Sequence, residues 1–347
     1  MTIDQAIHRL VLKESLSRAE MSGAMTQIMN GQATTVQIAA FLVALRVKGE
    51  TVDEISGATD AMRAAAVAVR VDCALVVDTC GTGGDGLGWF NVSTAAAFVV
   101  AGAGYTVAKH GNRSVTSRCG SADVLEALDI RIDPGLGIVE RQLRQIGVAF
   151  LFAPAFHPAT RHAMPVRREL GIRTIFNLLG PLTNPARPQV QLIGIYDPAW
   201  LKPVAESLIQ TGTRDSVIVH SQGNDEISLS GPTQVVEVVE GSIHIDEWWP
   251  EDFGLKAQPG HHLKGGSPKE NADTLLAVLK GESGPVRDTV CMNAAALIRA
   301  ASRSRAGSGR ALTLTQAFEV AARSIDSGAA RRKLDDLRQL AVQPFSG

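Results

Sequence analysis

The chain lacks an imbalance of charge, a cysteine motif and any long apolar run. Lys plus Arg number 34 and Asp plus Glu number 35, so the formal net charge is −1. This balance argues against a protein that binds nucleic acid or a membrane surface over its whole face. The cysteines (Cys73, Cys80, Cys119 and Cys291) have no CxxC spacing, which excludes a zinc ribbon and argues against a disulfide scaffold. No apolar run approaches the roughly 20 residues of a membrane span.

Aromatic residues are also scarce, at 5%. Hydrophobic residues nevertheless reach 45% and charged residues only 20%, which excludes a disordered chain. The first residues, MTIDQAIHRLVLKES, are amphipathic and lack the apolar core of a signal peptide. With 347 residues the chain is long enough for about two domains. We therefore expect a soluble, cytoplasmic, globular protein.

Residues 1–70 are predicted to form a small all-helical domain. Three capping boxes mark helix starts, each a hydroxyl residue followed three residues later by Glu or Gln. They pair Ser17 with Glu20, Thr34 with Gln37, and Thr51 with Glu54. No strand signal interrupts this part of the chain.

Residues 71–347 are predicted to form a larger α/β domain. Short apolar strands alternate with helical patterns, an order typical of a mostly parallel sheet. Strands are expected at 75–78, 105–108, 149–152, 191–195 and 216–219, with helices at 93–103, 136–146 and 199–211 between them. Residues 235–239 and 243–245 add an antiparallel hairpin, and 254–270 is expected to be a mobile loop.

A glycine-rich loop, Gly81 to Gly86, follows the first predicted strand and precedes a helix. Backbone N–H groups in such a loop can approach phosphate oxygens. The glycines also satisfy G-x-G-x-x-G, but no Asp or Glu between Gly86 and Ala122 could hold the ribose of a dinucleotide. A P-loop is excluded because no Gly-Lys-Ser/Thr closes the segment. A turn that only reverses the chain remains the alternative.

A second polar loop follows the next strand and should open at the same edge of the sheet. It runs from Lys109 to Ser121 and includes Arg113 and Arg118, with no acidic residue. Lys as a point charge and Arg as a bidentate donor suit a phosphate or diphosphate. The alternative is an exposed basic loop without a ligand.

Adjacent carboxylates and one arginine complete the candidate site. Asp225 and Glu226 follow the strand near His220, and Mg²⁺ takes one or two carboxylates together with substrate phosphates. Solvated surface acids are the alternative. Arg167, downstream of His157, could hold a substrate carboxylate or lie on the surface.

Six motifs together resemble the anthranilate phosphoribosyltransferase family. They are CGTGGDG, NVST, KHGNRS, CGSADVLEAL, NLLGPLTNP and NDEIS, in this order between Cys80 and Ser228. The resemblance as a whole extends from the helical N-terminus, QIAAFLVALRVKGET, to roughly residue 300. The resemblance implies transfer of phosphoribose from 5-phosphoribosyl 1-diphosphate to the amine of anthranilate, with Mg²⁺, in tryptophan biosynthesis. It also implies a fold similar to the pyrimidine nucleoside phosphorylases, a segment near 164–185 that rejoins the helical domain, and a homodimer.

The resemblance assigns site residues but no protein nucleophile. The substrate-binding set it implies is Gly81, Gly84, Asp85, Trp89, Asn91, Val92, Ser93, Thr94, Lys109, His110, Gly111, Asn112, Arg113, Ser114, Val115, Thr116, Ser117, Ser121 and Arg167. Ser93, Asp225 and Glu226 would hold the metal. Asn112 and Arg167, with Gly81 and His110, would face anthranilate. Lys109, His110 and Arg167 would act by positioning and electrostatics.

Three positions depart from the family pattern. Trp89 stands where the family has Thr or Ser, Cys119 where it often has Ser, and Asp129 where it has Gly.

Two other functions are weighed against the transferase. A non-catalytic nucleic-acid-binding relative predicts depleted loops and a strongly basic surface. The NDEIS pair and the long KHGNRS loop favour the transferase over a nucleoside phosphorylase.

Overall fold

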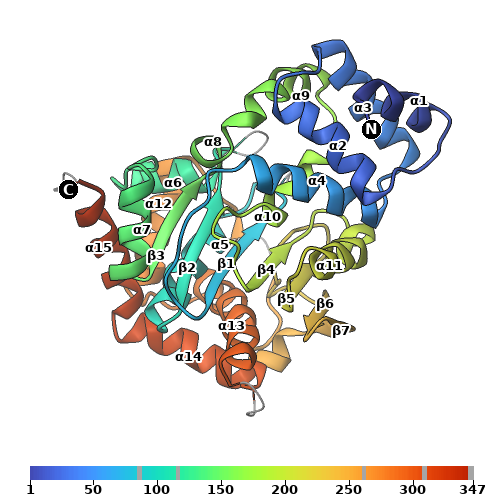
Figure 1. The fold of residues 1–347 in the computed structure, drawn as a ribbon. Helices are drawn as coiled ribbons and strands as arrows, with labels where there is room; N and C mark the ends of the chain where they lie inside the picture. Colours follow the sequence, from blue (N-terminus) through green and yellow to red (C-terminus); the bar gives the residue numbers. More distant parts are fainter. Residues whose placement is uncertain (84–87, 115–117, 260–262, 307–310, 343–347) are drawn as a thin grey trace.

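The computed structural model describes residues 1–83, 88–114, 118–259, 263–306 and 311–342. The N-terminal helices occupy one corner of the molecule, and a sheet covered by helices forms the rest (Figure 1). Among the described residues, no helix is both long and apolar enough to cross a bilayer.

Four helices form the N-terminal unit, as predicted. They are α1 (Ile3–Val11), α2 (Arg18–Met29), α3 (Thr35–Lys48) and α4 (Val52–Ala65). All three predicted capping boxes are present, at Ser17, Thr34 and Thr51. The helices bury an apolar core that includes Met21, Phe41 and other side chains.

Two later helices share that core. They are α9 (Met164–Leu170), which contacts α3, and α10 (Phe176–Leu182), which contacts α4. Val166 and Leu179 are buried in the same cluster as Met21. Three successive backbone carbonyls of α10 accept side-chain hydrogen bonds: Gly180 from His110, Pro181 from Gln191, and Leu182 from Arg63.

Within the described residues the second unit contains a seven-stranded sheet in the order β3-β2-β1-β4-β5-β6-β7. The strands are β1 (Val76–Gly81), β2 (Thr106–Gly111), β3 (Val148–Phe152), β4 (Val190–Gly194), β5 (Asp215–His220), β6 (Thr233–Val239) and β7 (Ser242–Trp248). β1 to β5 pair in parallel, and β6 and β7 add antiparallel. The predicted strands and hairpin are confirmed to within a few residues.

Helices cover both faces of the sheet because its strands are apolar on both sides. Val77 and Val107 face one core with α5, α13 and α14, whereas Ile193 and Ile218 face the core shared with the N-terminal helices. The remaining helices are α5 (Val92–Gly102), α6 (Ser121–Ala127), α7 (Leu136–Gln145), α8 (Ala153–Phe156), α11 (Leu201–Gln210), α12 (Pro268–Leu279), α13 (Pro285–Ala306), α14 (Leu314–Asp326) and α15 (Ala329–Val342), with 3₁₀ turns at Pro158–His162, Pro198–Trp200 and Pro250–Phe253.

The backbone conformation at position 129 accounts for one departure from the family pattern, Asp129 in place of glycine. This residue follows α6 with φ +59°, in the left-handed region that glycine adopts without strain. Its N–H donates to the Glu126 carbonyl at 2.9 Å and closes the helix. Asp is one of the few other residues that enter this region readily, so it can replace the family glycine here.

Candidate active site

The candidate site lies at the carboxyl ends of the central strands. The strand order reverses between β1 and β4, and open α/β sheets bind ligands at such a switch point. Gly81 ends β1, while Lys109, His110 and Gly111 end β2. The described starts of the two predicted polar loops therefore lie at one edge of the sheet (Figure 1).

The acidic pair faces the glycine loop. The Gly83 N–H donates to Asp225 Oδ2 at 2.8 Å, and the Ser93 N–H, in the first turn of α5, donates to Glu226 Oε1 at 3.2 Å. Both carboxylates are half-buried. Asp225 and Glu226 thus lie against Ser93, the third residue predicted to hold metal.

Two glycines make this approach possible. A Cβ on Gly81 would stand 2.3 Å from Asp225 Oδ2, and one on Gly194 would stand 1.5 Å from the Asp225 carbonyl oxygen. A side chain at position 81 would push the Asp225 carboxylate aside, and one at position 194 would displace the backbone of the acidic loop. Gly194, at the end of β4, was not identified from the sequence.

The acidic pair and Ser93 fit Mg²⁺ by the chemistry of their donors. Mg²⁺ takes one or two carboxylates and fills its remaining positions with waters and substrate phosphates. Among the described residues, no cluster of three or more His, Cys, Asp or Glu side chains could hold a metal with protein ligands alone. This arrangement favours a site that is completed by a phosphorylated substrate.

Lys109 is buried beneath this region, with 3% of its surface exposed. Its Nζ donates to the Thr79 carbonyl at 2.7 Å and to Ser93 Oγ at 3.3 Å. Asp78 is fully buried nearby, and burial raises its pKa against the opposing effect of the Lys109 charge. The Asp78 carboxylate accepts from the His110 N–H at 3.2 Å and from Asn184 Nδ2 at 2.8 Å. The cation and this network hold the end of β2 against β1.

His110 and His157 form a buried pair next to α10. Their ring centroids are 5.2 Å apart, and His110 Nδ1 lies 3.0 Å from the Gly180 carbonyl oxygen. Because a carbonyl only accepts, Nδ1 carries the proton and Nε2 of His110 is left as an acceptor. Neither Nε2 has a hydrogen-bond partner among the described residues. Two buried nitrogens without partners mark a place for a polar ligand.

Burial keeps both rings neutral. It lowers the pKa of His110 to about 3, with a further contribution from His157, and lowers the pKa of His157 to about 4. We therefore predict that lowering the pH from 7.5 to 5.5 reduces the free energy of unfolding by about 1.4 kcal/mol for each histidine. The unfolded rings, with a pKa near 6.5, take up protons in this range, whereas the folded rings do not. The stabilisation that each buried neutral ring contributes to the folded state is complete above pH 6.5 and is lost as the pH falls toward 4.

Urea unfolding of the His157→Gln variant at both pH values tests this prediction. The variant should lose about 1.4 kcal/mol less than the wild type between pH 7.5 and 5.5. His244→Gln, an exposed histidine on β7, is the control and should match the wild type. An unchanged pH dependence in His157→Gln would contradict the burial argument.

Arg167 stands on α9 without an acidic partner among the described residues. Its guanidinium lies 4.9 Å from the Phe176 ring centre, and Nη1 lies 3.5 Å from Met164 Sδ. Burial lowers the pKa of Arg167 to about 10, so the group remains cationic at pH 7. A substrate carboxylate would supply the anion that this arginine lacks.

Arg113 is already engaged by acidic residues. Its guanidinium donates to Glu126 Oε1 at 2.8 Å and to Asp123 Oδ1 at 3.2 Å, both on α6. Asp123 Oδ2 also accepts from the N–H groups of Ser114 and Gly120. Arg113 therefore holds the second polar loop on α6. This contact was not predicted from the sequence, because the loop itself contains no acidic residue.

Other predicted substrate residues also support the loop structure. Asn91 precedes α5 at the N-cap position without a capping hydrogen bond; its side-chain amide instead donates to the Cys119 carbonyl and accepts from Asn271. Thr94 Oγ1 donates to Ser121 Oγ at 3.1 Å. The Val92 side chain is fully buried in the core. The Asn112 carbonyl accepts from the Ala122 N–H, and the side-chain oxygen of Asn112 accepts from the Arg113 N–H.

The predicted residues Gly84, Asp85, Val115, Thr116 and Ser117 lie outside the described residues.

Trp89 pairs with a segment that is distant in sequence. It forms an antiparallel bridge with Lys264, flanked by hydrogen bonds from Phe90 to Leu263 and from Gly265 to Gly88. Leu263 is buried. The stretch 254–270 was expected to be a mobile loop. Its described part instead includes a strand-like pairing with the residues around Trp89, and its last residues belong to α12, which begins at Pro268.

Two buried asparagines position the site and were missed in the sequence. Asn184 donates to Asp78 and to the Ala108 carbonyl, both at 2.8 Å. Asn293, on α13, exchanges two hydrogen bonds with the backbone of Ile227 and so fixes the chain just after the acidic pair. The one signal for Asn293 was a polar residue within the apolar run CMNAAAL.

Family models match both units of the fold. The model described as "Glycosyl transferase family, helical bundle domain" matches residues 4–66, and "Glycosyl transferase family, a/b domain" matches residues 74–331. An anthranilate phosphoribosyltransferase from Symbiobacterium thermophilum is 52% identical over 327 residues, which are 94% of each chain. The predicted combination of a helical domain and a mostly parallel α/β domain is confirmed.

Solved structures agree with these matches. The anthranilate phosphoribosyltransferase of Thermus thermophilus has a TM-score of 0.91 at 42% identity, over 97% of this chain and 99% of that chain. The Saccharomyces cerevisiae enzyme in complex with PRPP and Mg has a TM-score of 0.88 at 28% identity, over 98% and 97%. On these grounds, this chain belongs to the anthranilate phosphoribosyltransferase family of enzymes.

Proposed function

We propose that this enzyme transfers the phosphoribosyl group of 5-phosphoribosyl 1-diphosphate to the amine of anthranilate. The products are N-(5-phosphoribosyl)anthranilate and diphosphate, and the step belongs to tryptophan biosynthesis. The observation that carries the proposal is the meeting of a glycine loop, a buried lysine and two carboxylates at one edge of the sheet. A phosphoribosyl donor that carries a diphosphate and binds Mg²⁺ would contact all three features.

On the donor side, Asp225, Glu226 and Ser93 would hold Mg²⁺. When bound, the ion would offset the charge that develops on the departing diphosphate. Lys109 supplies a fixed cation beside Ser93, and its two protein hydrogen bonds prevent it from moving as charge develops. The glycine loop contributes backbone N–H groups.

No protein nucleophile is required. The reaction is a displacement at the anomeric carbon, and the aromatic amine of anthranilate is already neutral at pH 7. Burial raises the pKa of Cys80 and raises that of Cys119 to about 11, so neither buried thiol forms a thiolate readily at neutral pH. Positioning and leaving-group stabilisation therefore carry the catalysis.

On the acceptor side, Arg167, Asn112, Gly81 and His110 would face anthranilate. The Arg167 cation would bind the carboxylate. His110 is neutral, and its Nε2 can only accept, so it suits an N–H donor such as the aryl amine. His157, its ring neighbour, would join this set.

We predict that Arg167→Ala raises the KM for anthranilate about 10- to 50-fold and changes kcat less than about threefold, because a carboxylate clamp contributes mainly uniform binding. Initial rates over a range of anthranilate concentrations measure both constants. Arg168→Ala removes an exposed arginine next in the chain and is the control. An unchanged KM in Arg167→Ala would place the acceptor carboxylate elsewhere.

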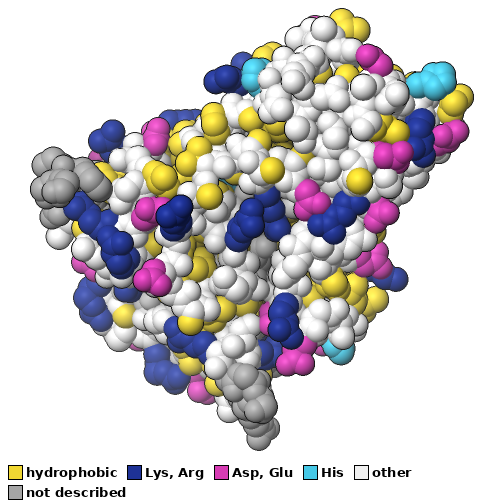
Figure 2. Space-filling model, viewed as in Figure 1, with side chains coloured by type: hydrophobic (Ala, Val, Ile, Leu, Met, Phe, Trp, Pro, Cys, Tyr) yellow, Lys and Arg dark blue, Asp and Glu magenta, His cyan; other side chains and the backbone are white. Residues whose placement is uncertain are grey.

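The activity itself is tested by incubating the protein with anthranilate, phosphoribosyl diphosphate and Mg²⁺ and following the loss of anthranilate fluorescence. The alternatives are not favoured, because close relatives over nearly the whole chain are transferases. A nucleic-acid-binding relative also predicts a strongly basic surface, whereas Figure 2 shows basic and acidic side chains interspersed on the face in view.

We further propose that residues 1–70 and the segment 164–185 form one helical domain, and that the enzyme is a cytoplasmic homodimer. Val36, Val43 and Val47 lie on one face of α3, and Val36 and Val47 are 76% and 73% exposed. Spacings of seven and four residues place these side chains in one stripe. An apolar stripe on this domain supports a contact with a second copy.

We predict that Val36→Glu combined with Val47→Glu halves the mass measured by light scattering, because it places charges in the interface. Ile245→Glu, on β7, alters an equally exposed side chain outside the helical domain and should leave the mass unchanged. A wild-type chain that is monomeric at micromolar concentration would contradict the homodimer.

A further inference from the structure

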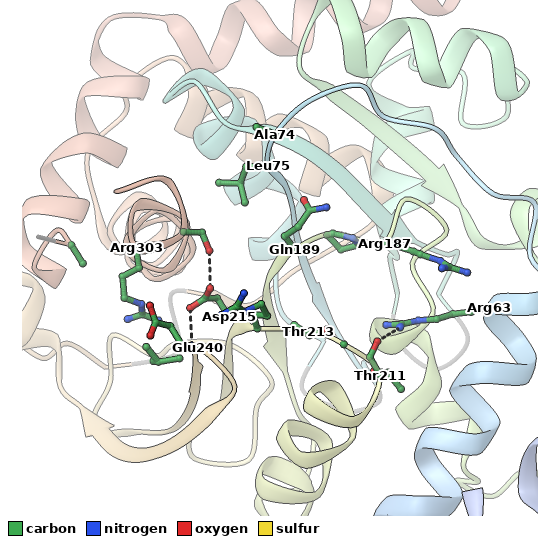
Figure 3. A pocket seen from close by; sticks show the side chains of 16 residues that line it. Arg63, Ala74, Leu75, Arg187, Gln189, Thr211, Thr213, Asp215, Glu240 and Arg303 are labelled. Carbon is green, nitrogen blue, oxygen red and sulfur yellow. Dashed lines mark hydrogen bonds between the residues drawn. The ribbon is translucent and has the colours of Figure 1, made fainter. Parts of the chain in front are cut away.

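A second cavity opens at the opposite edge of the sheet from the candidate active site. It has a volume of about 680 Å³ and is lined by residues at the amino ends of the parallel strands (Figure 3). Leu75 precedes β1, Gln189 precedes β4, and Asp215 begins β5. At about 3.3 Å per residue, the length of β1 separates this cavity from the glycine loop by roughly 17 Å. The proposed reaction makes no use of it.

Arg63 of α4 projects into one end of this cavity. Its Nε donates to the Leu182 carbonyl at 2.8 Å, and its Nη1 donates to the Thr211 carbonyl at 3.1 Å. These two carbonyls fix the guanidinium in place. No carboxylate among the described residues forms an ion pair with it.

Arg187 brings a second cation to the same end. Arg187 lines the cavity together with Arg63, and both are labelled in Figure 3. Burial, followed by the positive charge of Arg187, lowers the pKa of Arg63 to about 10, so the two cations are close enough to repel. Arg187 has φ +47°, a left-handed conformation that is costly for a residue other than glycine. Backbone strain of this kind often accompanies ligand clamps.

The other end of the cavity carries hydrogen-bond acceptors. Asp215 Oδ2 accepts from Ser304 Oγ at 2.8 Å, and Glu240 lies beside Asp215 in Figure 3. Arg303 also lines this end: its Nη1 donates to Glu237 at 2.8 Å, whereas its Nε and Nη2 have no hydrogen-bond partner among the described residues. The cavity therefore has a cationic end at Arg63 and Arg187 and a mixed end, where the acceptors Asp215 and Glu240 lie with the donors of Arg303.

We propose that this cavity binds a small phosphorylated molecule, whose phosphate lies at Arg63 and Arg187 and whose hydroxyl groups reach Asp215 and Glu240. Guanidinium groups match phosphate oxygens in pairs, and a dianion offsets both charges. The volume lies within the 300–1,000 Å³ or so typical of small-molecule sites and exceeds what a bare phosphate fills.

Calorimetric titration of the full-length protein without Mg²⁺ tests the proposal, with glycerol 3-phosphate as the probe. The wild type should bind it, and Arg187→Gln should weaken that binding at least tenfold. Arg187 is exposed, so the substitution should leave the fold intact. Arg323→Gln removes an arginine that is 67% exposed on α14 and should bind like the wild type. Equal affinity in Arg187→Gln and the wild type would overturn the proposal.

Two further arms identify the source of the phosphate. Inorganic phosphate that binds through Arg187 as tightly as glycerol 3-phosphate would assign the site to the free anion and overturn the role of Asp215 and Glu240. Sodium chloride at matched ionic strength should give no heat. As a second measurement, glycerol 3-phosphate at tenfold its wild-type Kd should raise the Tm of the wild type and raise that of Arg187→Gln by less than about a third as much. An equal rise in both proteins would contradict the proposed site.

Discussion

Replacing Asp225 with Asn and Glu226 with Gln together should lower kcat/KM by about 10³-fold or more, which is about 4 kcal/mol of transition-state stabilisation. The amides keep the size of the side chains but remove the two charges that would hold Mg²⁺ beside the diphosphate. The Gly83 and Ser93 N–H groups can still donate to the amide oxygens, so the fold of the acidic loop should persist. The rate should also require far more Mg²⁺ to reach half its maximum.

A matched double variant controls for the loss of two charges. Glu14→Gln combined with Glu319→Gln removes carboxylates that are 54% and 61% exposed and belong only to surface ion pairs. It should keep wild-type rates and the wild-type Mg²⁺ response. Wild-type turnover by the Asp225→Asn, Glu226→Gln variant at saturating Mg²⁺ would refute the metal assignment.

Replacing Lys109 with Met should lower kcat/KM by about 10²–10³-fold, the effect of removing one fixed electrostatic contact from the transition state. Met preserves most of the volume of the side chain but cannot donate to Thr79 or Ser93. Removing Lys109 also leaves the buried Asp78 without its nearby cation. The free energy of unfolding should therefore fall by up to about 3 kcal/mol.

Rates and urea unfolding measured on the same preparation separate the two effects of Lys109→Met. The activity should be lost under conditions where the variant is still fully folded. Lys202→Met removes a lysine that is 62% exposed and should change neither quantity. A folded Lys109→Met variant with more than a tenth of wild-type activity would show that the lysine serves the structure alone.

The strands and the position of the site could be predicted because they depend on local patterns. Alternating apolar strands and helices define the parallel sheet, and the carboxyl ends of its strands must share one edge. The glycine loop and the Lys109 loop therefore had to meet. Capping boxes such as Thr34 with Gln37 are equally local, and they recur unchanged in the structure.

The partners of individual side chains could not be predicted because they come from distant parts of the chain. Arg113 looked free to bind phosphate, but α6 folds back and places Glu126 and Asp123 against it. His157 had no evident role until the fold placed it beside His110. Asn293 reaches Ile227 across 66 residues. Such contacts depend on the packing of helices on the sheet, which no local pattern specifies.

The three successive carbonyls of α10 have a mechanical consequence. Gly180 is bound by His110 of β2, Pro181 by Gln191 of β4, and Leu182 by Arg63 of α4. A shift of this short helix along its axis would strain all three hydrogen bonds at once. The helix therefore acts as a rigid link, through which the N-terminal helices, the centre of the sheet and the His110 side of the active site keep their relative positions.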